Sequence, residues 1–168
     1  MSKKHDFSKI YDEHVAKIYR FVYLKVGTQE TAEDLSSEVF MRGWSSYDKI
    51  RNPKHEIRNI SAFLYQIARN VVADYYRKKG RVQVVSIEEM VIASSESLEE
   101  QASLSMDIEN IQKVLKELPD DYQNLIIWRY IDELSVPEIV EITGKSEGNV
   151  RVGIHRALQA LKGKIAAD

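Results

Sequence analysis

Cysteine is absent from this chain of 168 residues, which excludes disulfide bonds and thiolate metal sites. No apolar run approaches the roughly 20 residues that span a bilayer, and the N-terminal sequence MSKKHDFSKI has no apolar signal core. We therefore expect a cytoplasmic protein without membrane insertion, bound metal or cofactor. The four histidines are too scattered along the sequence to suggest a metal site. They are His5, His14, His55 and His155.

Residue groupings that carry catalysis are missing as well. The chain shows no nucleophile with an accompanying base and no glycine-rich phosphate loop. We expect neither enzymatic activity nor a small-molecule substrate. A hydrophobic content of 43% is nevertheless sufficient for packed cores. The length suits one ordinary domain or two small helical ones, and we favour two.

The formal net charge of −2 conceals a separation of charge along the chain. Residues 86–110 contain seven acidic side chains and no basic one, so removing them leaves +5 for the rest. Basic residues gather in two stretches, at 69–81 and 145–164. Two separate basic surfaces are typical of a protein that contacts nucleic acid at two places.

Residues 135–161, SVPEIVEITGKSEGNVRVGIHRALQAL, predict two short helices joined by a tight turn. Ser135 can cap the first helix, Pro137 is tolerated in its first turn, and Gly144 supplies the bend. At helical spacing the second helix has an apolar face and an opposite face rich in polar and basic residues. This pattern predicts a helix-turn-helix motif whose second helix can read DNA. The apolar face comprises Val150, Ile154, Ala157, Leu158 and Leu161; the opposite face comprises Gly148, Arg151, Val152, His155, Arg156 and Gln159.

Three helices are predicted in the first half of the chain, and further helical segments are predicted from Ile108 and from Pro119. Apolar spacing places a core helix over 7–26, a second over 28–45 with Thr28 as its N-cap, and a third over 61–80. The polar residues 48–59 have no sustained period and predict a loop before the third helix. Such loops often carry function.

The predicted fold class is therefore all-α, with two small helical domains. The first covers residues 1–81 and the second residues 107–168. Residues 82–106 are acidic, contain serine and are only weakly periodic, which favours a flexible acidic linker.

Two blocks of sequence resemble a known family. AEDLSSEVFMRGW with AFLYQIARNVVADYYRKK is similar to region 2 of bacterial sigma factors of the extracytoplasmic-function type, and LPDDYQNLIIWRYIDELSVPEIVEITGKSEGNVRVGIHRALQAL is similar to their region 4. The resemblance implies a dissociable specificity subunit of RNA polymerase that recognises a promoter with two elements. It also implies that an anti-sigma factor is a partner.

The resemblance further implies that the second helix of the motif enters the major groove of the −35 element. Physical reasoning agrees, because exposed arginines can donate bidentately to guanine or bind phosphate, and a valine can meet a thymine methyl group. The N–H groups at the start of the helix can bind phosphate. The implied −35 residues are Ser146, Asn149, Arg151, Val152, His155 and Arg156.

For the −10 element, the resemblance implies that the loop before the third helix captures an extruded base. The helix itself then holds the melted strand with aromatic faces and cations. The implied −10 residues are Asn52, His55, Asn59, Arg69, Asn70, Tyr76, Arg77 and Lys78.

The second helix matches the segment that binds the clamp coiled coil of the largest polymerase subunit. Region 4 is implied to contact the flap of the second-largest subunit. The implied polymerase-binding residues are Asp34, Glu38, Phe40, Arg42 and Trp44.

Simpler readings exist for several of these residues. Arg151, Arg156 and His155 could equally be ordinary solvated side chains. Asp34, Glu38 and Arg42, spaced four residues apart, could equally be a charged face that stabilises the second helix. Asn52 and His55 could equally form a turn and make no contact with a base. Tyr75 lies near the packing face and is expected in the core, whereas Tyr76 points outward.

Three positions depart from the family pattern. Val140 stands where alanine is common, which can alter the angle between the two helices of the motif. Gly153 stands where relatives often have a polar or basic side chain, and glycine inside a helix costs about 0.5–1 kcal/mol relative to alanine. Ser37 precedes Glu38 where glutamine is common. The charge separation also suggests that Glu96, Glu99 and Glu100 screen the basic surfaces.

Two other functions stay open at this stage. One is a dimeric helix-turn-helix repressor or activator, which would need a dimer surface and a palindromic operator. The other is an adaptor that shares the fold without binding DNA. The basic third helix and the basic face of the motif favour a sigma factor over both.

Overall fold

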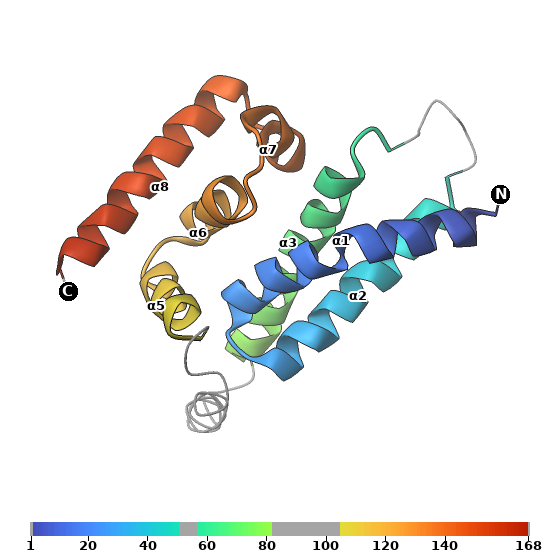
Figure 1. Ribbon diagram of the computed structural model, residues 1–168, viewed down its shortest axis with the longest axis horizontal. Coiled ribbons are helices and arrows are strands. Elements are labelled where there is room, and N and C mark those ends of the chain that lie inside the picture. The colour runs from blue at the N-terminus through green and yellow to red at the C-terminus, as the bar shows by residue number, and fades with distance from the viewer. Residues whose placement is uncertain (1, 51–56, 82–104, 168) are drawn as a thin grey trace. The chain divides into compact units, whose positions relative to one another are not determined.

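The computed structural model describes residues 2–50, 57–81 and 105–167 (Figure 1). Every regular element within these ranges is a helix, which confirms the all-helical prediction. None of the described helices is both long and apolar enough to cross a membrane. Five residues of interest lie outside the described ranges: Asn52, His55, Glu96, Glu99 and Glu100.

The chain divides into two compact units, residues 1–83 and 84–168, which we call the N-terminal and the C-terminal unit. The N-terminal unit contains α1 (Lys3–Val26), α2 (Gln29–Asp48) and α3 (Ile60–Arg81). Each of these three helices packs against the other two, so the unit is a small three-helix bundle.

The core of the N-terminal unit is formed where apolar stripes of the three helices meet. Phe21 of α1 is fully buried, and its ring lies edge-on to that of Tyr65 of α3, with ring centroids 5.7 Å apart. Helix α1 ends at Gly27, which adopts a left-handed φ of 87° that costs glycine little. Thr28 occupies the N-cap position of α2 as predicted, but its side chain makes no capping hydrogen bond.

Helix α2 lies close to its neighbours at Gly43. A Cβ atom at Gly43 would lie 3.3 Å from Cδ2 of Leu64 and 3.5 Å from Cζ of Phe7, so a larger residue would push these side chains apart. The predicted inner face of α2 is buried along its whole length, which confirms its helical period: Ala32, Leu35, Ser36, Val39 and Gly43.

Within its described residues, 105–167, the C-terminal unit has four α-helices and one π-helical turn. The elements are α5 (Ser105–Lys116), α6 (Asp120–Ile126), the π-helical turn η2 (Ile127–Ile131), α7 (Val136–Thr143) and α8 (Glu147–Ala167). Helix α8 packs against α5, α6 and α7. Trp128 of η2 is buried in this core with 1% of its surface exposed.

The π-helical turn is a wider helical turn that lies just before the helix-turn-helix motif. The N–H of Asp132 donates to the carbonyl of Ile127 at 2.8 Å, and that of Leu134 donates to the carbonyl of Trp128 at 2.8 Å. Glu133 between them has a positive φ of 57°. No local sequence signal predicts this turn, since π-helical turns have no simple residue signature.

Candidate nucleic-acid interface

The helix-turn-helix motif is built by α7, α8 and the turn at Gly144. Ser135 caps α7, and its Oγ accepts a hydrogen bond from the N–H of Glu138 at 3.2 Å. The Glu138 carboxylate in turn accepts from the N–H of Ser135 at 3.2 Å. This reciprocal capping box was not predicted, although a serine followed three residues later by glutamate is its sequence signal. Gly144 adopts a φ of 72°, which confirms its predicted place at the bend.

Helix α8 separates its two faces as its sequence predicts. Val150 and Ala157 are almost fully buried, and Ile154 is 8% exposed. The opposite face points to solvent. The residues that it exposes are Gly148, Arg151, Val152, His155, Arg156 and Gln159.

The start of α8 holds two of the predicted −35 residues in one capping contact. The N–H of Asn149 donates to Oγ of Ser146 at 3.2 Å, and the carbonyl of Ser146 accepts from the N–H of Val150 at 3.0 Å. Ser146 therefore stabilises the helix N-terminus. Both side chains remain exposed.

An ion pair that was not predicted lies on the exposed face of α8. Nη2 of Arg151 is 2.7 Å from Oε1 of Glu147, and both side chains are more than half exposed. The two residues are one helical turn apart, a spacing at which opposite charges meet.

Gly153 has a packing role in α8 that the sequence did not reveal. A Cβ atom at Gly153 would lie 3.0 Å from Cδ1 of Leu125 in α6. The end of the Leu125 side chain therefore lies close to the backbone of α8, and a side chain at Gly153 would require the buried Leu125 to shift by a few tenths of an ångström.

Helix α3 presents most of the predicted −10 residues. Asn70, Tyr76, Arg77 and Lys78 are exposed, and Arg69 is half-buried. Tyr76 is 41% exposed, while its hydroxyl donates a hydrogen bond to the carbonyl of Lys25 at the end of α1.

The ring of Tyr75 lies beside Tyr76, and the ammonium group of Lys79 lies over the Tyr75 ring. The Tyr75 and Tyr76 rings meet edge to face with centroids 5.3 Å apart, and Nζ of Lys79 lies 5.7 Å from the Tyr75 centroid. Tyr75 is half-buried, so its predicted place in the core is only partly realised.

Asn59 acts as a cap for α3. Its Oδ1 accepts a hydrogen bond from the N–H of Ala62 at 3.0 Å. This contact occupies one of the groups that the sequence assigned to base recognition. Asn52 and His55, predicted to act with it, lie outside the described residues.

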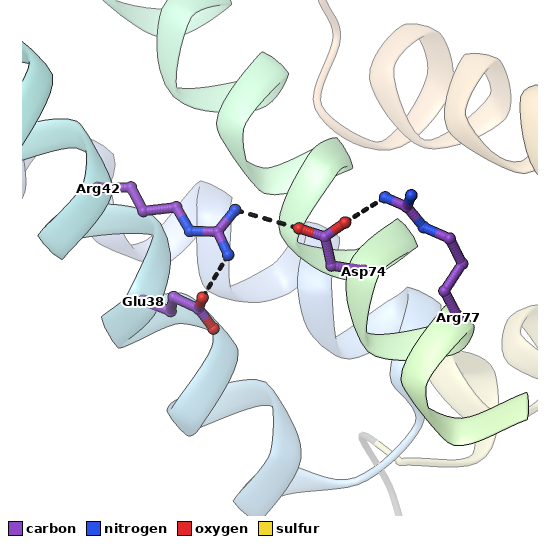
Figure 2. A network of polar contacts seen from close by, with 4 residues as sticks. All are labelled: Glu38, Arg42, Asp74 and Arg77. Atoms are coloured by element: carbon purple, nitrogen blue, oxygen red, sulfur yellow. Dashed lines mark hydrogen bonds and ion pairs between the residues drawn. The ribbon is translucent and has the colours of Figure 1, made fainter. Parts of the chain in front are cut away.

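A network of charges joins α2 to α3 (Figure 2). Arg42 of α2 contacts Glu38 at 2.5 Å and, through its other terminal nitrogen, Asp74 of α3 at 3.3 Å. Asp74 also pairs with Arg77. Desolvation lowers the pKa of Arg42, but the hydrogen bonds and charges of Glu38 and Asp74 outweigh it, so the pKa is raised overall. Asp74 was not predicted as a site residue, because its contact with Arg42 joins two helices that are far apart in the sequence.

The predicted polymerase-binding residues of α2 fall into an exposed and a packed set. Asp34 and Arg42 are exposed, and Glu38 is partly so. Phe40 is only 6% exposed, and its ring lies edge-on to Tyr11, with centroids 4.8 Å apart. The half-buried Trp44 packs against Phe7, with ring centroids 5.4 Å apart.

No group of three or more metal-binding side chains gathers among the residues that the structure describes. The candidate interface described above consists of exposed basic, aromatic and hydrogen-bonding side chains of α3 and α8. Such side chains bind nucleic acid and protein surfaces.

Comparison with protein families assigns both units. Residues 10–82 match the family described as Sigma-70 region 2, and residues 108–161 match the family described as Sigma-70, region 4. The two matches define the class of the protein as a sigma factor that carries regions 2 and 4.

Curated relatives narrow this class. The sigma factor SigW of Bacillus subtilis, of the extracytoplasmic-function type, is 36% identical over 167 residues, which covers 93% of this chain and 87% of SigW. BldN of Streptomyces coelicolor, of the same type, is 31% identical over 157 residues, covering 92% of this chain and 58% of BldN. The chain belongs to the extracytoplasmic-function RNA polymerase sigma factors. It directs promoter-specific initiation of transcription, so the dimeric regulator is not favoured.

Solved structures share the fold. The sigma factor RpoE of Bartonella quintana, in complex with the anti-sigma factor NepR, aligns with a TM-score of 0.70 and 21% identity over 97% of this chain and 98% of RpoE. CnrH, in complex with the cytosolic domain of CnrY, aligns with a TM-score of 0.72 and 19% identity over 98% of this chain and 90% of CnrH.

Proposed function

We propose that the C-terminal unit reads the −35 element of the promoter through the exposed face of α8. This proposal rests on the separation of α8 into a buried and an exposed face. Val150, Ile154 and Ala157 are buried, whereas Arg151 and Arg156 are exposed. A helix anchored in this way presents its basic face rigidly to a major groove.

Individual residues of α8 have distinct roles in this proposal. Arg151 and Arg156 donate to guanine edges or phosphates, Val152 contacts a thymine methyl group, and His155 contacts a base or a phosphate. Ser146 and Asn149 hold the N-terminus of α8, whose N–H groups bind phosphate.

The N-terminal unit is proposed to hold the melted −10 strand along α3. Tyr76 offers a ring on which a base stacks, while Arg77 and Lys78 follow the phosphates. Arg69 and Asn70 extend this surface along the helix. Asn52, His55 and Asn59 belong to the segment that captures the extruded base, with Asn59 also capping α3.

Helix α2 is proposed to bind the clamp coiled coil of the largest polymerase subunit through Asp34, Glu38 and Arg42. The ring of Trp44 contributes an apolar contact to this surface. Phe40 is buried, so it acts by packing α2 in place. The C-terminal unit contacts the flap of the second-largest subunit.

Control of the free protein is proposed to come from an anti-sigma factor, as RpoE is bound to NepR in its structure. The protein acts in the cytoplasm with its polymerase. It supplies recognition and has no enzymatic activity of its own.

Transcription by reconstituted polymerase tests the −35 proposal. Arg151→Ala should lower initiation from a promoter with the preferred −35 base about tenfold, since one good base contact is worth about 1–3 kcal/mol. Lys116→Ala removes an exposed cation of α5 and serves as the control. Equal promoter preference in the two variants would contradict a reading role for α8.

Strand opening tests the −10 proposal. Fluorescence of 2-aminopurine in the −10 region reports the melted strand, and Tyr76→Ala should weaken opening roughly tenfold, since stacking is worth about 1–3 kcal/mol per base. Tyr76→Phe keeps the ring and removes the hydroxyl, which donates to the Lys25 carbonyl. If Tyr76→Phe is as defective as Tyr76→Ala, stacking is not the role of this residue.

A further inference from the structure

An acidic residue stands at the beginning of the proposed DNA-reading helix. Glu147 is the first residue of α8, and its side chain is 57% exposed. Residues four apart lie on one side of a helix, so Glu147, Arg151 and His155 form one row along the exposed face. A carboxylate in this row opposes binding to phosphate, because the two groups carry the same charge.

The contact between Glu147 and Arg151 leaves part of the guanidinium available. Oε1 of Glu147 lies 2.7 Å from Nη2 of Arg151. A guanidinium has five N–H donors in a fixed planar fork, so the remaining donors can still reach the two acceptors of a guanine edge. A single contact of this kind restricts where the long arginine side chain points.

Helix stability alone is a weak account of this pair. An ion pair with both side chains more than half exposed contributes little to stability, because water screens it. Glutamate in the first turn also interacts favourably with the helix dipole. Neither effect depends on which DNA sequence is bound, so promoter preference separates them from a role in recognition.

We propose that Glu147 is a specificity-determining residue for the −35 element. It orients Arg151 toward a guanine and away from the phosphates. Its own carboxylate accepts a hydrogen bond only from an amino group, and in the major groove these are N4 of cytosine and N6 of adenine. Glu147 thus lowers general affinity for DNA and raises the discrimination between sequences. This inference rests on the proposed −35 role of α8.

Promoter selection from a library randomised in the −35 element tests the proposal with the full chain bound to core polymerase. Glu147→Gln keeps the size of the side chain and removes its charge. This variant should bind promoter DNA more tightly at low salt and lose about fivefold or more of its preference at one or two −35 positions, one of them the position that Arg151→Ala affects.

Glu117→Gln is the matched control, since Glu117 is an exposed residue that follows α5 in the same unit and loses the same charge. This control should leave the ranking of −35 sequences unchanged. An altered ranking in Glu147→Gln, with the variant still fully folded at the temperature of the assay, would support a role in recognition.

Two results would overturn the inference in different ways. If Arg151→Ala alters the ranking and Glu147→Gln does not, Glu147 only stabilises the helix, and the proposed function stands. If neither variant alters the ranking, α8 does not read the −35 element, and the proposed function fails together with the inference.

Discussion

Replacing Gly153 by alanine should destabilise the C-terminal unit, against the usual rule for helices. Glycine inside a helix normally costs about 0.5–1 kcal/mol relative to alanine, so the substitution should stabilise if nothing lies nearby. In this structure, however, the new Cβ would lie 3.0 Å from Cδ1 of Leu125. Such a contact is shorter than van der Waals separation between carbon atoms.

The expected size of the effect follows from two opposing terms. Overpacking of a core costs about 1–3 kcal/mol, and the gain in helix propensity offsets up to about 1 kcal/mol of it. We expect a net loss of about 1 kcal/mol, which lowers the unfolding midpoint of a small domain by about 4–8 °C.

Fluorescence of Trp128, which lies in the core of the C-terminal unit, reports this unfolding. A Trp44→Phe background removes the other tryptophan of the chain. Gly163→Ala in the same helix is the control, because nothing lies within 4 Å of a Cβ at that position. This control should stabilise by about 0.5–1 kcal/mol.

A double-mutant cycle with Leu125→Ala isolates the contact. Once the Leu125 methyl groups are gone, Gly153→Ala should become stabilising, with a coupling energy of about 1–3 kcal/mol between the two positions. If Gly153→Ala raises the midpoint as much as Gly163→Ala does in the otherwise unchanged chain, the reasoning about this contact is refuted.

Three further substitutions probe local features of the fold. Ser135→Ala should cost the C-terminal unit about 1 kcal/mol in urea unfolding, since it removes the cap of α7, and an unchanged midpoint would argue against the capping box. Glu133→Gly should raise the free energy of unfolding of the C-terminal unit by about 0.5–1 kcal/mol, because φ at this residue is positive. A lower free energy of unfolding in the same assay would contradict this. Burial lowers the pKa of His14, as does Lys17, although Glu13 opposes them. The unfolded chain therefore takes up the proton more readily, so the N-terminal unit should lose stability as pH falls below about 6.5, and His14→Gln should abolish this loss.

Local signals in the sequence predicted much of this structure. Gly27 and Gly144 end their helices in left-handed conformations, and Ser135 caps α7, because these effects depend on only a few neighbouring residues. The two faces of α8 followed from the helical period alone.

Features that depend on packing between helices could not be predicted in the same way. Arg42 meets Asp74 across 32 positions of sequence, and the Tyr76 hydroxyl meets the Lys25 carbonyl across 51. The sequence presented Gly153 only as a weak point of α8, because Leu125 is near it in space and not in the chain.

Two of the predicted site residues have packing or capping contacts that the motif does not indicate. Phe40 matches a polymerase-binding position, yet packing against Tyr11 buries it. Asn59 matches a base-contacting segment, yet its side chain caps α3. In both cases the residue type fits a structural and a binding role, and the binding role stays a prediction.

Run-off transcription tests the central claim most directly. Purified core RNA polymerase would transcribe a genomic promoter library with and without this protein, and the transcripts would be sequenced. We expect a set of start sites that depends on the protein and shares two sequence elements at a fixed spacing. If no start site depends on the protein while it binds duplex DNA tightly by itself, its role as a sigma factor is contradicted.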